Sequence, residues 1–355
     1  MNLVSLGWNN AFANHFAEYE QQGYTVGRVA LEHKHMYRVY TEQGDLLSEV
    51  SGKLRFQAFG REDYPAVGDW VVLSARPEEG RATIHAILPR KSKFSRKVAG
   101  DSHEEQIVAA NVDTIFLVTA MNLDFNLRRI ERYLIAAWES GANPVIILSK
   151  ADLCDDVEEK LRAVEEVAIG VPVHAVSSVQ NEGVDALASY LGEGRTVALL
   201  GSSGVGKSTL LNRIYGGEVL KTGDIRDGDD KGKHTTTHRE LVHLPNGGLL
   251  IDTPGMRELQ LWDGDSGITD SFADIEEIAA QCQFSDCQHR NEPKCAVNDA
   301  LRDGSLDRGR YNNYVKLQKE LAYIARKDNK KEQAAEKEKW KKITMAQRQR
   351  PTHKR

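Results

Sequence analysis

The stretch GSSGVGKST, residues 201–209, constrains the fold of this 355-residue chain more than any other feature. It matches G-x-x-x-x-G-K-[ST], a loop whose backbone N–H groups curl around nucleotide phosphates and which needs glycine where a side chain would block that approach. The apolar run TVALL precedes it and TLLNRIY follows with helical spacing, so the loop joins a strand to a helix. We therefore predict a nucleotide-binding α/β domain. Such loops normally follow the first strand of their domain, yet here 200 residues come first.

The loop assigns roles to its own residues. Lys207 would reach the β- and γ-phosphates, and the Ser208 hydroxyl would bind Mg²⁺. We expect every loop residue to contact the nucleotide: Gly201, Ser202, Ser203, Gly204, Val205, Gly206, Lys207, Ser208 and Thr209. The alternative is a plain Gly- and Ser-rich turn, and the flanking strand and helix argue against it.

Two segments after the loop are typical of GTPase switches. In LLIDTPGMREL a buried strand ends in Asp252, whose carboxylate would hold Mg²⁺ through water, and the Gly255 amide would sense the γ-phosphate. Between this segment and the loop lies KGKHTTTHREL, residues 231–241, with three consecutive threonines. One of them would bind Mg²⁺; the sequence does not choose among them, and Thr236 is our candidate. A simple turn and a Thr-rich loop are the alternatives.

A GTPase must also recognise guanine, usually through Asn-Lys-x-Asp after one strand and a Ser-Ala turn after the next. Nothing after residue 255 fits these patterns. Ahead of the loop, however, the strand VIIL ends in Ser149, Lys150, Ala151 and Asp152, and the strand VPVHAV ends in Ser177 and Ser178. Both motifs are present in the right mutual order, but upstream. We therefore predict a circularly permuted GTPase domain, which a parallel sheet tolerates because the positions of the strands, not their chain order, build the site.

Alternation of elements supports this fold. The runs VDTIFLVTAM, PVIILSKADL, VPVHAVSS and TVALL read as buried parallel strands, and the segments between them have helical spacing, including VDALASYL. Repeated strand–helix units predict a parallel sheet covered on both faces.

The first hundred residues have a different pattern. TVGRVALEH, MYRVYTEQGDLLSEVSGKLRF and GDWVVLSARPEEGRATIHAIL are β-rich runs with turn signals, and about five strands in 70 residues suit a small barrel such as an OB-fold. PRKSKFSRKVAG, residues 89–100, follows with five basic residues and no acid. We predict that this connector contacts a phosphate backbone through Lys91, Lys93, Arg96 and Lys97. Phe94 is either a stacking platform or a plug in a domain seam.

Near the C-terminus, CQFSDCQHRNEPKC contains Cys282, Cys287, His289 and Cys295. Three thiolates and one imidazole match a closed tetrahedral structural zinc site without a vacant position for catalysis. Unrelated buried thiols are the alternative. Cys154 stands alone and reads as a packed thiol.

Composition limits the other options. We expect no signal peptide, because the N-terminus lacks a basic start and an apolar stretch, and we expect no membrane span because no apolar run approaches about 18 residues. Four cysteines are too few for a disulfide framework, so the chain reads as cytosolic. Residues 326–355 carry a net charge of +8, which leaves −13 on the rest of a chain whose total is −5. This tail suggests a polyanionic partner, or else a solvated helix.

The strings GSSGVGKST, GKHTTTHREL, IDTPGMREL and CQFSDCQHRNEPKC, behind a small barrel, resemble the RsgA (YjeQ/YloQ) family of circularly permuted GTPases over about residues 20–325. The resemblance implies an N-terminal OB-fold, a central GTPase and a mainly helical C-terminal zinc domain. It also implies GTP/GDP, Mg²⁺ and one structural Zn²⁺ as ligands. The implied activity is hydrolysis of GTP to GDP and phosphate, stimulated by the small (30S) ribosomal subunit during late maturation of that particle.

The resemblance also implies residue roles. Asp152 would take the guanine N1 and N2 hydrogens, Lys150 would pack along the base, and the Ser178 amide would meet O6. The family usually has Asn at Ser149, so we expect a weaker contact there, with GTP still preferred. Ras-like enzymes orient the attacking water with a Gln where this chain has Met256, and the family implicates His234 instead, with Lys207 and Thr236 completing the catalytic set.

The sequence thus predicts five regions and three candidate functions. The regions are an N-terminal extension at 1–20, an OB-fold with its basic connector at 21–100, a GTPase domain at 101–265, a zinc domain at 266–325 and a charged tail at 326–355. The leading interpretation is a cytoplasmic GTPase, monomeric when free, whose partners are the small ribosomal subunit and its rRNA. A constitutive RNA-binding module with a structural nucleotide latch, and a small-molecule P-loop kinase, are the alternatives.

Overall fold

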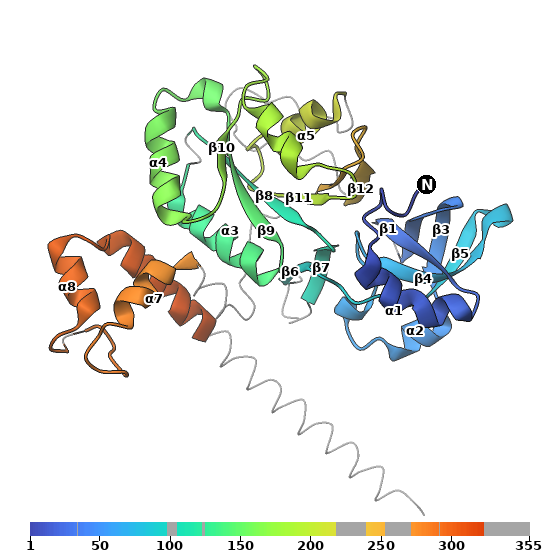
Figure 1. Ribbon diagram of the computed structural model, residues 1–355, viewed down its shortest axis with the longest axis horizontal. Coiled ribbons are helices and arrows are strands. Elements are labelled where there is room, and N and C mark those ends of the chain that lie inside the picture. The colour runs from blue at the N-terminus through green and yellow to red at the C-terminus, as the bar shows by residue number, and fades with distance from the viewer. Residues whose placement is uncertain are drawn as a thin grey trace, which may run out of the picture. The chain divides into compact units, whose positions relative to one another are not determined.

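The computed structural model describes residues 1–33, 35–97, 105–122, 125–217, 239–252, 271–290 and 292–322. The chain divides into two compact units, residues 1–260 and residues 261–355. The first unit contains a small barrel, blue in Figure 1, and an α/β sheet, drawn from teal to yellow-brown. The second unit is helical. The predicted fold class is confirmed.

The barrel has five strands in the connectivity of an OB-fold. Their bounds are β1 (Thr25–His33), β2 (Met36–Thr41), β3 (Gly44–Val50), β4 (Trp70–Arg76) and β5 (Arg81–Ile87). The neighbour order is β1-β2-β3-β5-β4, and β4 pairs back with β1 to close the barrel. Alternate side chains of these strands, such as Val29, Val39 and Leu73, are fully buried in the interior.

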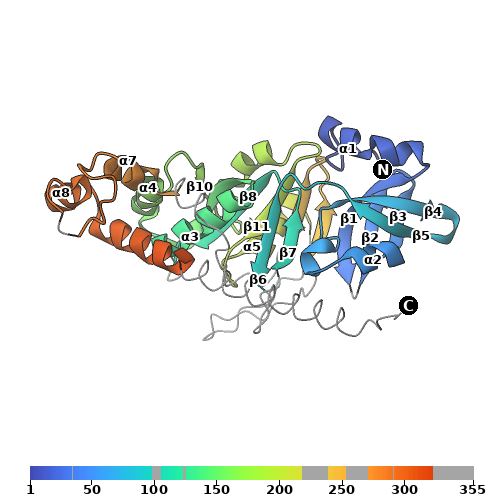
Figure 2. The ribbon, with the colours of Figure 1, turned by 90° about the horizontal axis from the view of Figure 1, so that it is seen from below.

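Two helices lie outside the barrel strands (Figure 2). In α1 (Asn10–Gln21), the Asn9 side chain caps the first turn, and Phe12 and Phe16 are buried. The short α2 (Gly52–Gln57) replaces the strand that the sequence pattern predicted for GKLRF. The reason is local, because the Ser51 hydroxyl accepts the Leu54 N–H at 3.2 Å and so starts a helical turn. A 3-10 turn, η1 (Arg61–Asp63), follows, and another, η2 (Pro77–Glu79), joins β4 to β5.

The α/β part of this unit has the neighbour order β10-β9-β8-β11-β13-β12. Its strands are β8 (Thr114–Ala120), β9 (Asn143–Ser149), β10 (Val173–Ala175), β11 (Thr196–Leu200), β12 (Glu240–His243) and β13 (Leu249–Asp252). All pair in parallel except β12. The phosphate-loop strand β11 lies between β8 and β13, although β8, β9 and β10 all precede it in the chain. This is the permuted arrangement that the sequence predicted.

Helices α3 (Leu127–Glu139), α4 (Val157–Val167) and α5 (Lys207–Tyr215) connect these strands. The predicted helix VDALASYL is instead a 3-10 helix, η4 (Val184–Tyr190). Its N-cap is Gly183, which has no side chain to accept an N–H of the first turn. A short 3-10 turn, η3 (Ala151–Leu153), follows β9.

The basic connector includes a strand with a buried aromatic residue. It forms β6 (Lys93–Lys97), which pairs with β7 (Glu105–Ala110) in an antiparallel hairpin. Phe94 is only 5% exposed, so it is a plug and not a stacking platform. Lys91 donates to Asp113 at 2.6 Å. Of the two alternatives for Phe94, the plug is therefore the one observed. Lys91 is exposed as well as paired, so RNA contact by the basic residues of the connector stays a prediction.

A buried arginine joins the barrel to the α/β sheet. Arg28, on β1, is 1% exposed, and its guanidinium donates to the carbonyl oxygens of Leu6, Gly68 and Asn111. Burial lowers the pKa of Arg28 to about 10, and the nearby carboxylates of Asp113 and Asp69 oppose this shift. The side chain therefore keeps its charge at neutral pH and holds three chain segments at one point.

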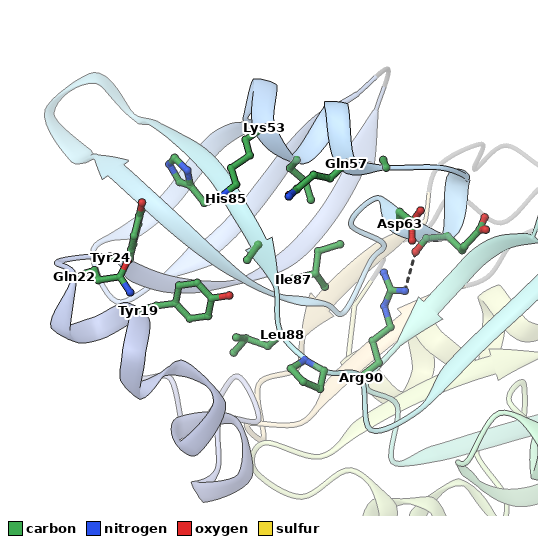
Figure 3. A pocket seen from close by; sticks show the side chains of 15 residues that line it. Tyr19, Gln22, Tyr24, Lys53, Gln57, Asp63, His85, Ile87, Leu88 and Arg90 are labelled. Atoms are coloured by element: carbon green, nitrogen blue, oxygen red, sulfur yellow. Dashed lines mark hydrogen bonds between the residues drawn. The ribbon is translucent and has the colours of Figure 1, made fainter. Parts of the chain in front are cut away.

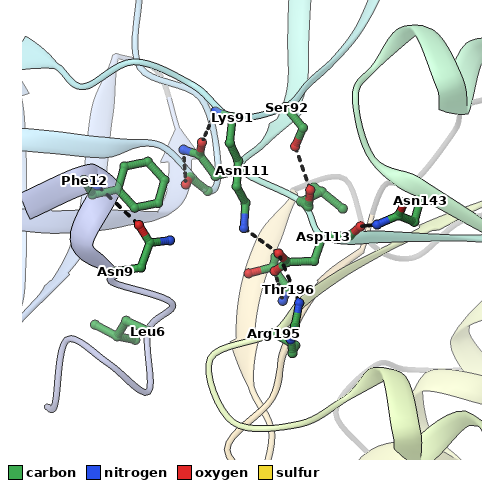
Figure 4. A network of polar contacts seen from close by, with 12 residues as sticks. Leu6, Asn9, Phe12, Lys91, Ser92, Asn111, Asp113, Asn143, Arg195 and Thr196 are labelled. Carbon is green, nitrogen blue, oxygen red and sulfur yellow. Dashed lines mark hydrogen bonds and ion pairs between the residues drawn. The ribbon is translucent and has the colours of Figure 1, made fainter. Parts of the chain in front are cut away.

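Asn111 and Asp113 complete this junction (Figure 4). The Asn111 side chain accepts the Lys91 N–H at 2.9 Å and donates to Gly68. The Asp113 carboxylate accepts the Thr196 N–H at 2.8 Å. Each buried polar group of this pair has a partner on another segment, which favours one relative position of barrel and sheet.

The barrel and the α/β sheet also share strand pairing. Leu31 of β1 pairs with Glu240 of β12. The Arg38 side chain on β2 forms an ion pair with Glu240, and the Tyr40 hydroxyl donates to the Leu241 carbonyl at 3.3 Å. The sheet therefore continues from one domain into the other through β12.

The second unit contains α7 (Ala273–Ala279), α8 (Ala296–Asp303) and a helical stretch at 308–322. Arg310 is 5% exposed and forms hydrogen bonds of 2.7 and 2.9 Å with the Asp274 carboxylate, while its guanidinium lies 4.7 Å from the Phe272 ring centroid. Tyr314 donates to Glu276 at 2.6 Å. These contacts tie the last helical stretch to α7. The charged tail, 326–355, lies outside the described residues.

Candidate functional site

The phosphate loop connects β11 to α5, as predicted. A Cβ atom on Gly201 would lie 2.2 Å from the Val118 carbonyl oxygen, so only glycine fits there. Gly206, directly before α5, has a φ of 94°, which only glycine adopts without strain. The Lys207 ammonium is 6% exposed and donates to the carbonyls of Gly201 and Ser202, each at 2.7 Å. The loop thus curls around its own lysine.

The turn after β9 lies against this loop. The buried Ser149 hydroxyl donates to the Val205 carbonyl at 2.6 Å, across 56 positions of sequence. Lys150 follows in the left-handed conformation, with φ 59° and ψ 39°. The half-buried Asp152 comes next, in η3. The structure therefore brings the predicted Ser-Lys-Ala-Asp turn beside the phosphate loop although it precedes the loop in the chain.

The turn after β10 adjoins the same place. The Ala151 N–H donates to the Val176 carbonyl at 3.1 Å, which ties the two turns together. Ser177 is fully buried, and its hydroxyl accepts the Gln180 N–H at 3.1 Å. Arg213, in the last turn of α5, donates to the carbonyls of Ser178 and Val179 at 3.0 and 3.1 Å. Both upstream turns are thus bonded to the loop or to its helix.

Two contacts in this region were missed by sequence reasoning. On α3, Arg129 donates to the Ser202 hydroxyl at 2.9 Å, and the Tyr133 hydroxyl lies 3.4 Å from the same atom. The contact of Arg213 with the turn after β10 is the other. It was missed because a basic residue near a helix C-terminus is usually explained by its interaction with the helix dipole. Helical spacing places Arg129 and Tyr133 on one face of α3, but no sequence pattern indicates that this face meets the phosphate loop.

The Mg²⁺ side of the site is described in part. Ser208 is the second residue of α5 and is half-buried. Asp252 ends β13, which pairs directly with β11, so its backbone lies beside the strand that leads into the loop. His234, Thr236 and Gly255 lie outside the described residues, and the Asp252 side chain is not described either.

The four predicted metal ligands lie together in the second unit. Their ligand atoms are all within 4.8 Å of one another. The His289 Nδ1 atom is 3.6 Å from the Cys282 sulfur and 3.4 Å from the Cys295 sulfur, and these two sulfurs are 3.9 Å apart. A tetrahedral ion with metal–sulfur bonds of about 2.3 Å separates its sulfur ligands by about 3.8 Å. The spacing therefore fits a tetrahedral metal.

The start of α8 faces this cluster. The Asn298 N–H donates to the Cys295 sulfur at 3.4 Å. Burial opposes ionisation of Cys282, but hydrogen bonds from the Val297 and Ala296 backbones outweigh it and lower its pKa. Amides that donate to sulfur stabilise thiolates, which are the form that binds metal.

A parallel α/β sheet, with a phosphate loop on its central strand and two polar turns folded beside that loop, defines a P-loop nucleotide-binding protein with permuted chain order. A family model described as RsgA GTPase matches residues 87–262. A second model, described as ABC transporter, matches residues 184–351, which include β11 and the phosphate loop but not β8, β9 and β10.

Relatives match nearly the whole chain. It is 48% identical to "Small ribosomal subunit biogenesis GTPase RsgA 1" of Oceanobacillus iheyensis, over 98% of this chain and 99% of the relative. The protein of the same name, without the number, from Opitutus terrae is 47% identical, over 99% and 98%. The solved structure of YjeQ from Thermotoga maritima aligns with a TM-score of 0.63 and 31% identity, over 84% of this chain and 99% of that one. YloQ, described as a circularly permuted GTPase, aligns with a TM-score of 0.59 at 26% identity, over 84% and 95%.

The chain therefore belongs to the RsgA family of small ribosomal subunit biogenesis GTPases, and it is a GTP hydrolase. In the part of the chain that the structure describes, no helix has both the length and the apolar character that a membrane crossing requires.

Proposed function

We propose that this GTPase binds the small (30S) ribosomal subunit and its rRNA, and that it hydrolyses GTP to GDP and phosphate in late maturation of that particle, stimulated by it. The observation that carries the proposal is the near-complete match to relatives named for small-subunit biogenesis. The bonds from Ser149 to Val205 and from Arg213 to Ser178 support it, because they hold both upstream turns at the phosphate loop. Such work takes place in the cytoplasm, where we propose that the free protein is a monomer.

At the nucleotide, Asp152 accepts the guanine N1 and N2 hydrogens, Lys150 packs along the base and the Ser178 amide donates to O6. Ser149 makes the weaker nucleotide contact expected of a hydroxyl, and its bond to the Val205 carbonyl holds the turn against the loop. The remaining nucleotide contacts come from Ala151, Ser177, loop residues 201–209, Asp252 and Gly255.

The loop has two further tasks, namely holding phosphate charge and holding Mg²⁺. Lys207 exchanges its carbonyl partners for the β- and γ-phosphates, which requires no large movement because it already lies inside the loop. Ser208, Thr236 and, through water, Asp252 hold Mg²⁺. The ion would neutralise charge that develops on the phosphates.

The attacking water needs another residue, because Met256 stands where Ras-like enzymes have Gln. We assign this task to His234, with slow intrinsic turnover until a docked particle orders its segment. His234→Ala should therefore lower subunit-stimulated hydrolysis by about 100-fold or more while leaving GDP affinity unchanged. Phosphate release with and without purified 30S particles measures the first quantity, and fluorescent GDP titration measures the second.

His238→Ala is the matched control, since it removes an imidazole from the same segment. If His234→Ala retains full stimulation, the role assigned to His234 is wrong. If the unchanged protein neither sediments with 30S particles in a non-hydrolysable GTP analogue nor is stimulated by them, the ribosomal function itself is wrong. Binding that does not depend on the nucleotide and is not accompanied by stimulated turnover would instead indicate the RNA-binding module with a structural latch.

We further propose that Cys282, Cys287, His289 and Cys295 hold one structural Zn²⁺. The ligand spacing and the amide–sulfur bonds at α8 support this assignment. Three sulfurs and one nitrogen fill a tetrahedral shell, so the ion would order this unit and would leave no position for substrate.

Cys295→Ser should reduce bound zinc from about one ion per chain to near zero. The unit around it should then unfold, because the free energy of metal binding at a structural site contributes directly to the free energy of folding. Metal analysis by mass spectrometry and limited proteolysis of the purified protein measure both effects. Cys154→Ser is the matched control, since that thiol lies in the other unit. One equivalent of zinc retained by Cys295→Ser, or none in the unchanged protein, would contradict the assignment.

A further inference from the structure

The exposed segment Gly52–Arg61, which contains α2 and is called the α2 segment below, has no task in the mechanism described above. Phe56 and Phe59 are 91% and 100% exposed, the highest values among the large apolar side chains of the described residues. A phenyl ring in water forgoes the free energy that burial of its large apolar surface would supply. Two such rings, three positions apart on one segment, indicate a surface that contacts a partner.

The charge of the α2 segment indicates what kind of partner fits. Lys53, Arg55 and Arg61 are exposed, and the segment contains no acidic residue. None of the three basic side chains forms an ion pair within the described ranges. Positive charge interleaved with exposed aromatic rings is the pattern of proteins that stack bases and neutralise phosphates along a single strand.

The segment is rigid enough to present these rings. Ser51 caps α2, and the Ser51 N–H donates to the Ile84 carbonyl on β5 at 2.8 Å. After the helix, the Asp63 carboxylate accepts the N–H groups of Phe59 and Gly60 at 2.8 and 3.2 Å. The start of the segment is therefore fixed to β5 and its end is held by a local turn, so less conformational entropy is lost when a ligand binds.

A groove of about 630 Å³ adjoins the segment (Figure 3). Lys53 and Gln57 of α2 line it, with His85 beside Lys53, and the rings of Tyr24 and His85 are 5.0 Å apart. Glu62 and Asp63 are the acidic residues of its lining, at the end where Arg90 also lies. Asp63 accepts the two amides described above, and Lys53 lies at the other end of the groove, away from these two carboxylates.

We propose that the α2 segment is a binding surface for single-stranded RNA, with Phe56 and Phe59 stacking on bases and Lys53, Arg55 and Arg61 contacting phosphates. The proposal rests on the ribosomal function proposed above and assigns the RNA contact to a surface other than the basic connector. The connector cannot supply the aromatic part, because Phe94 is buried, and its Lys91 is paired with Asp113.

The test uses the full-length protein and a labelled oligouridine of about 12 nucleotides, within the site size of one OB-fold. Phe56→Ala together with Phe59→Ala should weaken binding by at least about 30-fold, since each base–aromatic stack is worth a factor of about five or more and two stacks are lost. Ile169→Ala, which removes an apolar side chain that is 66% exposed on the other domain, should change nothing. Thermal unfolding and GDP affinity confirm that the variants are folded.

Charge is tested separately through salt. Lys53→Ala together with Arg55→Ala should make the slope of log affinity against log salt shallower by about 1.4, because two phosphate contacts on a single strand are lost. Arg76→Ala with Arg162→Ala, two exposed arginines paired with Glu79 and Glu158, is the matched control. Its slope should stay close to that of the unchanged protein.

Three results would overturn the proposal. The phenylalanine variant could bind the oligonucleotide within about twofold of the unchanged protein. The unchanged protein could show no binding even at about 50 mM salt, where phosphate contacts are strong. The variant could also lose 30S sedimentation but keep oligonucleotide affinity, which would assign the surface to a ribosomal protein. In the first and last cases, sedimentation of the unchanged protein with 30S particles would leave the proposed ribosomal function standing.

Discussion

Replacing Arg28 with methionine is expected to lower the free energy of unfolding of residues 1–260 by about 3–5 kcal/mol. Methionine roughly preserves the volume of the side chain but removes every donor. The carbonyl oxygens of Leu6, Gly68 and Asn111 would then be buried without these partners, and each such loss costs about 1–3 kcal/mol. Chemical denaturation followed by circular dichroism measures the change.

The matched control is Arg38→Met, which also removes an arginine of the barrel. Arg38 is half-exposed and pairs with Glu240, so its loss should cost about 1 kcal/mol or less. Arg28→Lys should fall between the two, because one ammonium replaces a fork of donors but keeps the charge. Equal destabilisation by Arg28→Met and Arg38→Met would show that the buried guanidinium does not hold the two domains together.

Asp152→Asn is expected to weaken GTP binding by at least about 1000-fold. The carboxylate accepts hydrogen bonds from guanine N1–H and N2–H, whereas the asparagine amide has only one oxygen to accept them and an NH₂ group that cannot accept either. The same variant should bind xanthosine triphosphate better than GTP, because xanthine presents an oxygen at C2 to which the asparagine amide can donate. Competition titrations with both nucleotides measure the preference.

Asp155→Asn is the control for this prediction, because Asp155 is an exposed carboxylate only three residues away. It should leave both affinities unchanged. If Asp152→Asn still prefers GTP, guanine is recognised by some other group, and the assignment of the upstream turns fails with it.

The fold was predictable wherever short-range patterns determine it. The phosphate loop, the buried strands and the cysteine spacing are all local, and parallel strands bring their carboxyl-terminal turns to one edge of the sheet. That is why Ser149 and Ser178 could be assigned to the loop's neighbourhood although they lie upstream of it. The same reasoning failed at GKLRF, where the single Ser51 cap decides for a helix in a β-rich stretch.

Contacts between distant segments could not be predicted in the same way. The bond from Ser149 to Val205 spans 56 positions, and the bond from Arg28 to Asn111 spans 83. Composition made the connector look like an RNA-binding segment, because basic residues dominate it. Whether Lys91 pairs with Asp113 and whether Phe94 is buried depend on how distant segments pack, and a local pattern does not contain that information.

The pairing of β1 with β12 has a thermodynamic consequence. β12 begins directly after the threonine segment of the nucleotide site, and the barrel holds it through Arg38 and Tyr40. Any ligand that displaces this shared strand changes the free energy of both domains at once. By linkage, a factor by which GTP alters affinity for a barrel ligand must equal the factor by which that ligand alters affinity for GTP. Displacement of this one shared strand would thus join nucleotide binding and binding of a barrel ligand in a single coupled equilibrium.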